Sequence, residues 1–411
     1  MKPLTPSRFL PAAGLFAAWW VIVHRTLLAG ETYFLRDFWT NYVPTRHILR
    51  DAFSRFTLPL WNPWIAGGTP VIPDPNHGVF YLPAWPFLLF KDQAWALSVA
   101  TDVHTLLAAA GTYFLARRWA SRTGATVAAA AFGFGGLMLT NVINAHWHFG
   151  WSWAPLWFWA VARLLDAPSA RRASVVGGIW ALQLLSAEPQ VAYLEGLALP
   201  LLWMGRLWET PAAERRERLW GLAWLAGALG IAVLIAAPQL VGLFEALGQS
   251  DRPNLTLKDS SVWSYHAGRL WELVLPQPWG VHTPVTTFWG GHLVTGPWYG
   301  FYFASLYTGA LAVPLACVGV RHLGKRHVVL AAGVFLLWLS SMGEDTPVFG
   351  VLRSVVPLWR TFRYPERFVL LPMLTLALLM ARGVDAALTL KRWQSALMMA
   401  LPGVAAAIAA A

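Results

Sequence analysis

Long runs of apolar residues recur along almost the whole chain and constrain its fold more than any other feature. Hydrophobic residues make up 57% of the 411 residues and charged residues only 12%, whereas a soluble domain carries about 25% charged residues. A helix needs roughly 17 to 25 apolar residues to cross a bilayer. The runs lie at about 9–29, 94–116, 124–143, 148–165, 173–187, 190–205, 219–240, 298–320, 327–342, 367–387 and 394–411. The sequence therefore predicts an all-α fold, a polytopic transmembrane helix bundle of about eleven spans.

Two of these runs are short for a span and follow each other closely. Glu188 and Pro189 interrupt the apolar sequence between 173–187 and 190–205. The two runs form either one bent unit or a helical hairpin, and the alternation of charged connections favours the hairpin. Further upstream, FGFGG at 132–136 lies inside an apolar run. It predicts close helix packing by small residues rather than a nucleotide-binding loop.

Basic residues mark every second connection between the runs. They are Lys2 and Arg8, then Arg117, Arg118 and Arg122, then Arg163, Arg171 and Arg172, then Arg206, Arg215, Arg216 and Arg218, then Arg321, Lys325 and Arg326, then Lys391 and Arg392. Because connections rich in Lys and Arg stay in the cytoplasm, the amino terminus is predicted to be cytoplasmic. Topology thus accounts for the net charge of +11, and no contiguous basic domain suggests nucleic acid as a partner.

The chain is predicted to be a single transmembrane domain over 1–411 with three long extracytoplasmic loops, at 31–83, 245–297 and 343–366. The first loop is too rich in Pro and Gly to cross a membrane. Irregular backbone beside a bilayer needs water or protein around its polar groups. We therefore expect the functional cavity at the outer surface, where short interfacial helices and most polar residues collect.

The first loop carries the candidate catalytic residues Asp37, Asp74 and His77. Asp37 follows the first apolar run beside Arg36, where its carboxylate can accept a proton as a general base. The alternatives are a salt bridge to Arg36 or a cap on the following helix. Asp74 and His77 form either a base or half of a metal site. Equally, Asp74 can cap a turn in which His77 plays no part.

A segment at 45–57 is predicted to be an interfacial amphipathic helix. One face carries Ile48, Leu49, Ala52, Phe53 and Phe56, and the other carries Arg46, Arg50 and Arg55. These arginines either grip a lipid phosphate or rest among headgroups. Trp61 follows in the same loop, and it belongs either to the aromatic belt of the interface or to a sugar-binding surface.

Arginines also collect in the sequence LWRTFRYPERF at 358–368, on the side where the positive-inside rule disfavours them. Arg360, Arg363 and Arg367 either anchor the surface by snorkelling or, with Arg36, clamp the phosphate of a lipid-linked donor. Their predicted outward position favours the clamp.

The outer ends of three other runs supply candidate substrate-lining residues, His146, His148 and Glu188. The histidine spacing matches no recognisable zinc site. Oxygen ligands such as Asp37 and Asp74 leave room for a divalent metal beside a phosphate, but no metal site is predicted. No Walker A loop or nucleophile elbow occurs in the sequence, so any group transfer needs a donor that is already activated.

Several segments together resemble the YfhO family of bacterial membrane proteins, which is similar in architecture to the integral-membrane glycosyltransferases of the GT-C class. The resemblance covers nearly the whole chain. It rests on the Asp37 loop with LPLWNPWIAGGTPVIPDPNHGVFYLP at 58–83, NAHWHFGWSWAPLWFW at 144–159, SAEPQ at 186–190, YHAGRLWELVLPQPWG at 265–280, YFASLYTGALAVPLA at 302–316 and MGEDTPVFGVLRSVVPLWRTFRYPERF at 342–368.

The resemblance implies an outward-facing site in a bacterial plasma membrane. It also implies transfer of a sugar from a polyprenyl-phosphate donor to a cell-envelope polymer or lipid acceptor. The acidic residue of the first outer loop in the GT-C pattern corresponds to Asp37. Family members usually continue further, so this chain, which ends inside an apolar run, is expected to stop short of the family length.

The sequence leaves two rivals to a sugar transferase. A transporter or flippase of a lipid-linked sugar would need charged residues along a path near mid-membrane, for which Asp102, His104 and Glu195 are candidates. A non-catalytic scaffold for envelope assembly would tolerate Asp37→Asn. The concentration of polar residues outside the bilayer favours the transferase.

Overall fold

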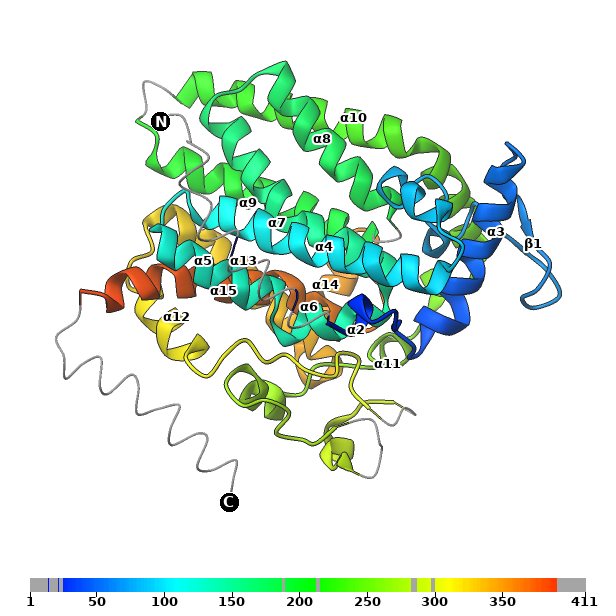
Figure 1. Ribbon diagram of the computed structural model, residues 1–411. Helices are drawn as coiled ribbons and strands as arrows, with labels where there is room; N and C mark the ends of the chain where they lie inside the picture. Colours follow the sequence, from blue (N-terminus) through cyan, green and yellow to red (C-terminus); the bar gives the residue numbers. More distant parts are fainter. Residues whose placement is uncertain are drawn as a thin grey trace.

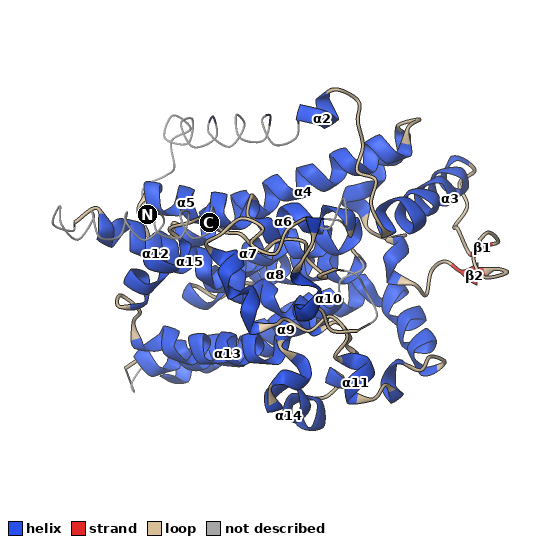
Figure 2. Ribbon diagram, turned by 90° about the horizontal axis from the view of Figure 1, so that it is seen from below, coloured by secondary structure: helices blue, strands red, loops and turns tan. Residues whose placement is uncertain are grey.

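The computed structural model describes residues 25–186, 189–211, 215–281, 287–296 and 300–389, with Gly14 and Val21 besides. This part of the chain is mostly helical (Figures 1 and 2). Its one sheet is a two-stranded antiparallel hairpin of β1 (Trp61–Asn62) and β2 (Thr69–Pro70). The predicted run at 394–411 and most of that at 9–29 lie outside the described residues.

The helices follow one another with short connections, except for two long irregular stretches after α3 and α11. They are α2 (Arg25–Leu28), α3 (Val43–Ser54), α4 (Gln93–Ala116), α5 (Arg122–Gly133), α6 (Gly136–Thr140), α7 (Ala145–Asp166), α8 (Ala170–Leu185), α9 (Pro189–Glu209), α10 (Arg215–Gly248), α11 (Leu257–Ser260), α12 (Ala312–Val320), α13 (Lys325–Ser341), α14 (Pro347–Val355) and α15 (Leu370–Ala387). The separate helices α8 and α9 agree with the predicted hairpin.

Among the residues that the structure describes, three helical stretches are long and apolar enough to cross a membrane, at Arg122–Ile143, Trp220–Gly248 and Pro365–Ala387. A shorter apolar helix covers His327–Ser341. The chain is thus a helical protein with several membrane-spanning candidates, and the predicted count of about eleven spans is not confirmed.

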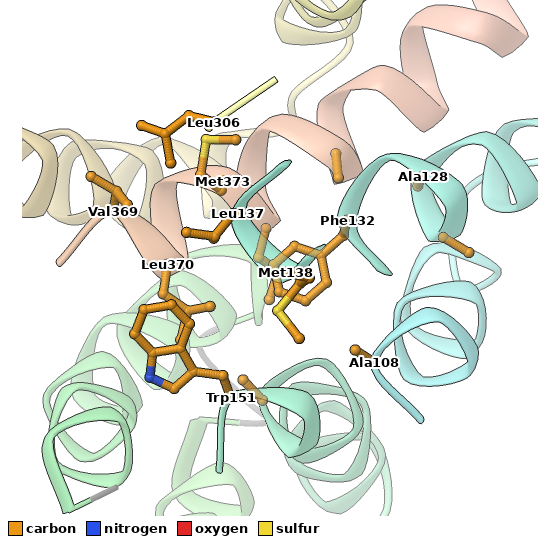
Figure 3. Close-up of a cluster of buried hydrophobic side chains, with 14 of the residues drawn as sticks. Ala108, Ala128, Phe132, Leu137, Met138, Trp151, Leu306, Val369, Leu370 and Met373 are labelled. Carbon is orange, nitrogen blue, oxygen red and sulfur yellow. The ribbon is translucent and has the colours of Figure 1, made fainter. Parts of the chain in front are cut away.

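Neighbouring helices in the bundle pack in pairs. α4 lies against α5 and α7, α8 against α10, α9 against α13, and α15 against α5 and α12. At one centre of this packing, Trp151 of α7, Phe132 of α5, Met138 of α6 and Leu370 of α15 meet in a buried apolar cluster (Figure 3). Such clusters supply the dispersion contacts that hold helices together within a membrane.

The glycine-rich sequence at 132–136 separates α5 from α6. Gly133 packs on α4 so closely that a Cβ atom there would lie 2.6 Å from Cβ of Ala109, which agrees with the predicted helix packing. Gly136 serves a different purpose, because its N–H donates to the carbonyl of Tyr307 (2.6 Å). The glycine-rich sequence therefore allows both α4 and the non-helical segment around Tyr307 to approach its backbone closely.

That non-helical segment corrects the predicted span at 298–320. Residues 300–311 contain no helix, and α12 begins only at Ala312. Backbone that is not helical still needs hydrogen-bond partners when it is buried. Here buried side chains supply them: Arg269 donates to the carbonyl of Phe303 (2.8 Å), and Glu272 accepts from the N–H of Leu306 (3.2 Å).

These side chains belong to a buried ionic cluster that the sequence did not reveal. Arg269 is fully buried and donates to both carboxylate oxygens of Glu272 (2.7 and 2.8 Å) and to Glu366. Glu366 also accepts from the backbone N–H of Tyr302 (3.2 Å). These three charged residues lie outside the run at 298–320, so a hydrophobicity profile of that run gives no sign that they hold it in a non-helical form.

Helix α3 confirms the predicted helix near 45–57 but corrects the place of one arginine. Arg46 is fully buried and donates to the carbonyl of Ala84 (2.7 Å). Burial lowers its pKa to about 10. Arg55 is exposed and pairs with Asp51 (2.6 Å). The 3-10 helix Leu82–Leu89 packs on α3 and covers Arg46, one of the three arginines that were expected among headgroups.

Candidate functional site

Four aromatic side chains from distant parts of the chain meet near the start of α15. Tyr302 stacks on Tyr364 (5.5 Å between ring centroids) and on Trp147 of α7 (5.8 Å), and it meets Trp263 edge-on (5.2 Å). Glu366 holds the non-helical backbone at Tyr302, and this backbone places the Tyr302 ring between the rings of Tyr364 and Trp147. Tyr42 is buried within electrostatic reach of the same ring.

Arginines lie on the outer faces of these rings. Arg36 lies 5.1 Å from the centroid of Trp263 and donates to the carbonyl of Tyr302 (3.2 Å). Arg367 lies 3.9 Å from the centroid of Trp147, and Arg363 lies 4.9 Å from that of Tyr364. Cation–π contacts of this kind orient a guanidinium group without neutralising it. Three of the four predicted phosphate-binding arginines therefore share one aromatic platform.

A fourth arginine, Arg252, lies within electrostatic reach of Arg363 and Arg367, and the sequence did not single it out. The residue is exposed overall, yet loss of water to surrounding protein lowers the pKa of its guanidinium, and the positive charges of Arg367 and Arg363 lower it further. The charges of Tyr364 and Asp74 raise the pKa of Arg252. Arg252 follows α10 in the long loop that is predicted to be extracytoplasmic. Its only signal in the sequence is that it is a basic residue in a connection where the positive-inside rule disfavours basic residues.

Asp37 belongs to the first loop and lies within electrostatic reach of Tyr42, on which Arg367 also acts. It is exposed, and its carboxylate makes no cap hydrogen bond to the helical turn Phe38–Tyr42 that follows. The described structure also contains no ion pair between Asp37 and Arg36, whose side chain turns to Tyr302. The described structure thus shows neither the salt bridge to Arg36 nor the helix cap, which were the two alternatives to a functional role for Asp37.

Tyr42 lies within electrostatic reach of both aspartates. Burial raises the pKa of its hydroxyl, and the charges of Asp37, Tyr302 and Asp74 raise it further, while Arg367 lowers it. Opposite and like charges act on a pKa through their proximity, so Asp37, Asp74 and Arg367 all belong to the surroundings of this phenol.

The turn at 74–77 has the capping geometry that the sequence left open. Asp74 accepts from the backbone N–H and the side-chain amide of Asn76 (2.9 Å each), and Nδ1 of His77 lies 2.7 Å from the carbonyl of Val71. His77 is buried, and its Nε2 lies 4.0 Å from Asp74. His77 thus fixes the turn, while half-buried Asp74 stays within range of the cations.

The turn is also joined to the aromatic platform. Nε1 of Trp147 donates to the side-chain oxygen of Asn76 (3.1 Å). Behind it, the fully buried ring of His146 stacks on Tyr42 (5.1 Å). Gly78, at φ 59°, touches this ring, since a Cβ atom there would lie 2.3 Å from it. His146 therefore supports the site from behind rather than lining it.

The remaining predicted residues lie elsewhere. His148 is buried against Thr105 of α4 (2.8 Å). Trp61 covers Gly68 in the β1–β2 hairpin, which projects beyond α3 (Figures 1 and 2). Arg360 donates to the carbonyl of Arg353 (3.2 Å). Glu188 lies outside the described residues.

Residues suggested for a transport path have local partners. Asp102 accepts from the hydroxyl of Tyr33 (2.6 Å), and Glu195 accepts from Gln183 (2.9 Å). His104 lies 2.5 Å from the hydroxyl of Tyr81. All three candidates are buried. Within the described ranges, no cluster of three His, Cys, Asp or Glu side chains could hold a metal ion.

A scan against protein-family models matches none of them, and no curated protein matches the chain. Among solved structures, the chain is similar to ArnT from Cupriavidus metallidurans, whose crystal structure is bound to undecaprenyl phosphate. The two share 15% sequence identity over 91% of this chain and 78% of that chain, with a TM-score of 0.44. A likeness this remote leaves the function to be argued from the residues themselves.

Proposed function

We propose that the protein is a membrane glycosyltransferase of GT-C type that acts on the outer side of a bacterial plasma membrane. It moves a sugar from a polyprenyl-phosphate donor to a cell-envelope acceptor. One observation carries the proposal: Arg36, Arg363 and Arg367 lie over the rings of one aromatic platform, and Arg367 and Asp37 act on the same buried phenol, that of Tyr42. The resemblance to the YfhO family supports the same assignment.

The cations provide a site for an anionic leaving group. Four arginines, Arg36 included, face two aspartates, and the buried cluster of Arg269 behind them carries one further negative charge. The site therefore keeps a net positive charge. Several arginines held close together favour binding of an anion, because the anion relieves their mutual repulsion. Guanidinium groups bind phosphate oxygens through paired donors, so Arg363 and Arg367, helped by Arg252, hold the donor phosphate.

Asp37 then acts as the base. The acceptor oxygen forms a bond to the anomeric carbon as the bond from that carbon to the phosphate oxygen breaks, which inverts the configuration. The hydroxyl proton passes to Asp37, and the polyprenyl phosphate leaves with the negative charge that the arginines stabilise. Asp74 orients the acceptor, and the rings of Trp147, Tyr302 and Tyr364 form the floor of the site.

The test uses membranes that contain a radiolabelled polyprenyl-phosphate sugar and matched amounts of each variant. Asp37→Asn should lower transfer of label to envelope polymer about 100-fold or more, the usual contribution of a general base. Arg363→Ala should weaken donor binding about tenfold, as expected for one lost charge-assisted hydrogen bond. Arg55→Ala is the matched control, because Arg55 is an exposed arginine of the same predicted side that pairs with Asp51 in α3.

The same experiment separates the rival functions. Label that crosses the membrane without transfer, with Asp37→Asn equal to wild type, would assign the protein as a transporter. A variant Asp37→Asn that supports envelope assembly normally without any labelled product would identify a scaffold. Either result overturns the transferase.

A further inference from the structure

An apolar groove runs along the bundle between α7, α9, α13 and α15. It encloses a cavity of about 330 Å³. Leu197 and Leu201 of α9, Leu330 and Leu337 of α13, and Leu374 and Leu378 of α15 are among its lining side chains. Leu197 is 38% exposed, so the groove opens sideways between the helices. A membrane protein presents such an opening to hydrocarbon chains.

One end of the groove is basic. Arg118 and Arg206 line it there together with His327. Both guanidinium groups donate through Nη2 to Asp166, whose carboxylate takes one arginine on each oxygen. An arginine has five N–H donors, and one aspartate balances only one of the two charges. This end is therefore suited to an anion.

The other end of the groove is apolar, at Leu352 of α14, at Val356 just after that helix and at Trp359. The groove thus has a basic end and an apolar lining along the rest of its length. These two features match the headgroup and the acyl chain of an anionic lipid. The arginines of the candidate functional site, Arg363 and Arg367, lie beyond the apolar end. A lipid whose phosphate is held at Arg118 is consequently oriented opposite to a donor held at Arg367.

The basic end follows the positive-inside pattern, since Arg118 and Arg206 belong to connections predicted to be cytoplasmic. We infer that the groove binds an anionic glycerophospholipid of the cytoplasmic leaflet, with its phosphate at Arg118 and Arg206 and an acyl chain along α9 and α13. The partner chemistry follows from charge complementarity at one end and apolar lining along the rest. The inference is independent of the proposed transferase activity.

The test is native mass spectrometry of the whole protein, released from nanodiscs that contain phosphatidylglycerol and phosphatidylethanolamine. The wild-type protein should retain phosphatidylglycerol in preference to phosphatidylethanolamine. Combined Arg118→Gln and Arg206→Gln substitutions should lower its retention about tenfold or more, the factor for one lost charge-assisted hydrogen bond. Arg171→Gln is the matched control, because this exposed arginine is on the same predicted side but outside the groove.

A second variant does not disturb the ion pairs. Ala198→Trp places a large side chain inside the groove and should abolish retention of the lipid while the thermal unfolding temperature stays near that of wild type. The inference is overturned if wild type retains no phospholipid, or if Ala198→Trp retains as much as wild type. It is equally overturned if the retained lipid is a polyprenyl phosphate whose binding depends on Arg363 rather than on Arg118.

Discussion

Single residues decide whether the candidate site exists at all, and Arg269 is the clearest case. Its guanidinium joins Glu272 and Glu366, and through them it fixes the backbone at Tyr302. The sequence predicted the surface arginines Arg363 and Arg367, because cations on the outer side stand out against the topology. It did not predict Arg269, because a buried charge has no signature until its partners are known.

Removal of Arg269 should therefore unfold the region rather than only slow the reaction. Arg269→Met leaves two buried carboxylates without their cation, a change that costs about 3–5 kcal/mol in other proteins. We expect a markedly lower midpoint of thermal unfolding in detergent. Arg171→Met, at an exposed position, should leave the midpoint unchanged, and an equal loss in both variants would show that the buried cluster has no special role.

Among the elements, the non-helical segment 300–311, which packs on the break between α5 and α6, differs most from what the sequence could show. Hydrophobicity predicted the apolar runs, the α8–α9 hairpin and α3, since periodicity and proline positions are local signals. The non-helical segment 300–311 depends on contacts with Gly136, Glu272 and Glu366. These contacts join residues far apart in the chain, so no local pattern could predict them.

Gly136→Ala tests this arrangement. A Cβ atom at this position would lie 2.6 Å from Oγ of Ser305 and 2.7 Å from the backbone N of Tyr307. The substitution should destabilise the protein by about 1–3 kcal/mol, as overpacking does, and should raise hydrogen exchange at residues 302–307. Gly178→Ala in α8 meets nothing within 4 Å and should stabilise the helix by about 0.5–1 kcal/mol. Equal behaviour of the two variants would contradict the close approach.

At the scale of the whole molecule, the two ends of the bundle carry different chemistry. The aromatic platform with its arginines lies where α15 begins, whereas Arg118, Arg206 and Asp166 lie where α4, α9 and α7 end. Alternation of basic connections predicted this separation without any knowledge of packing. A substrate at one end and a lipid headgroup at the other can then bind together without competing.

The orientation of these two ends in the membrane is open to direct measurement. Cys317 is the only cysteine, so Cys317→Ser gives a background in which single cysteines can be placed. In intact cells with a permeable outer envelope, an impermeant maleimide should label Trp61→Cys, because this exposed hairpin is predicted to face outside. Arg171→Cys, also exposed, should react only after the membrane is opened. The reverse pattern would place the arginine platform in the cytoplasm, where a donor and acceptor of the cell envelope do not meet.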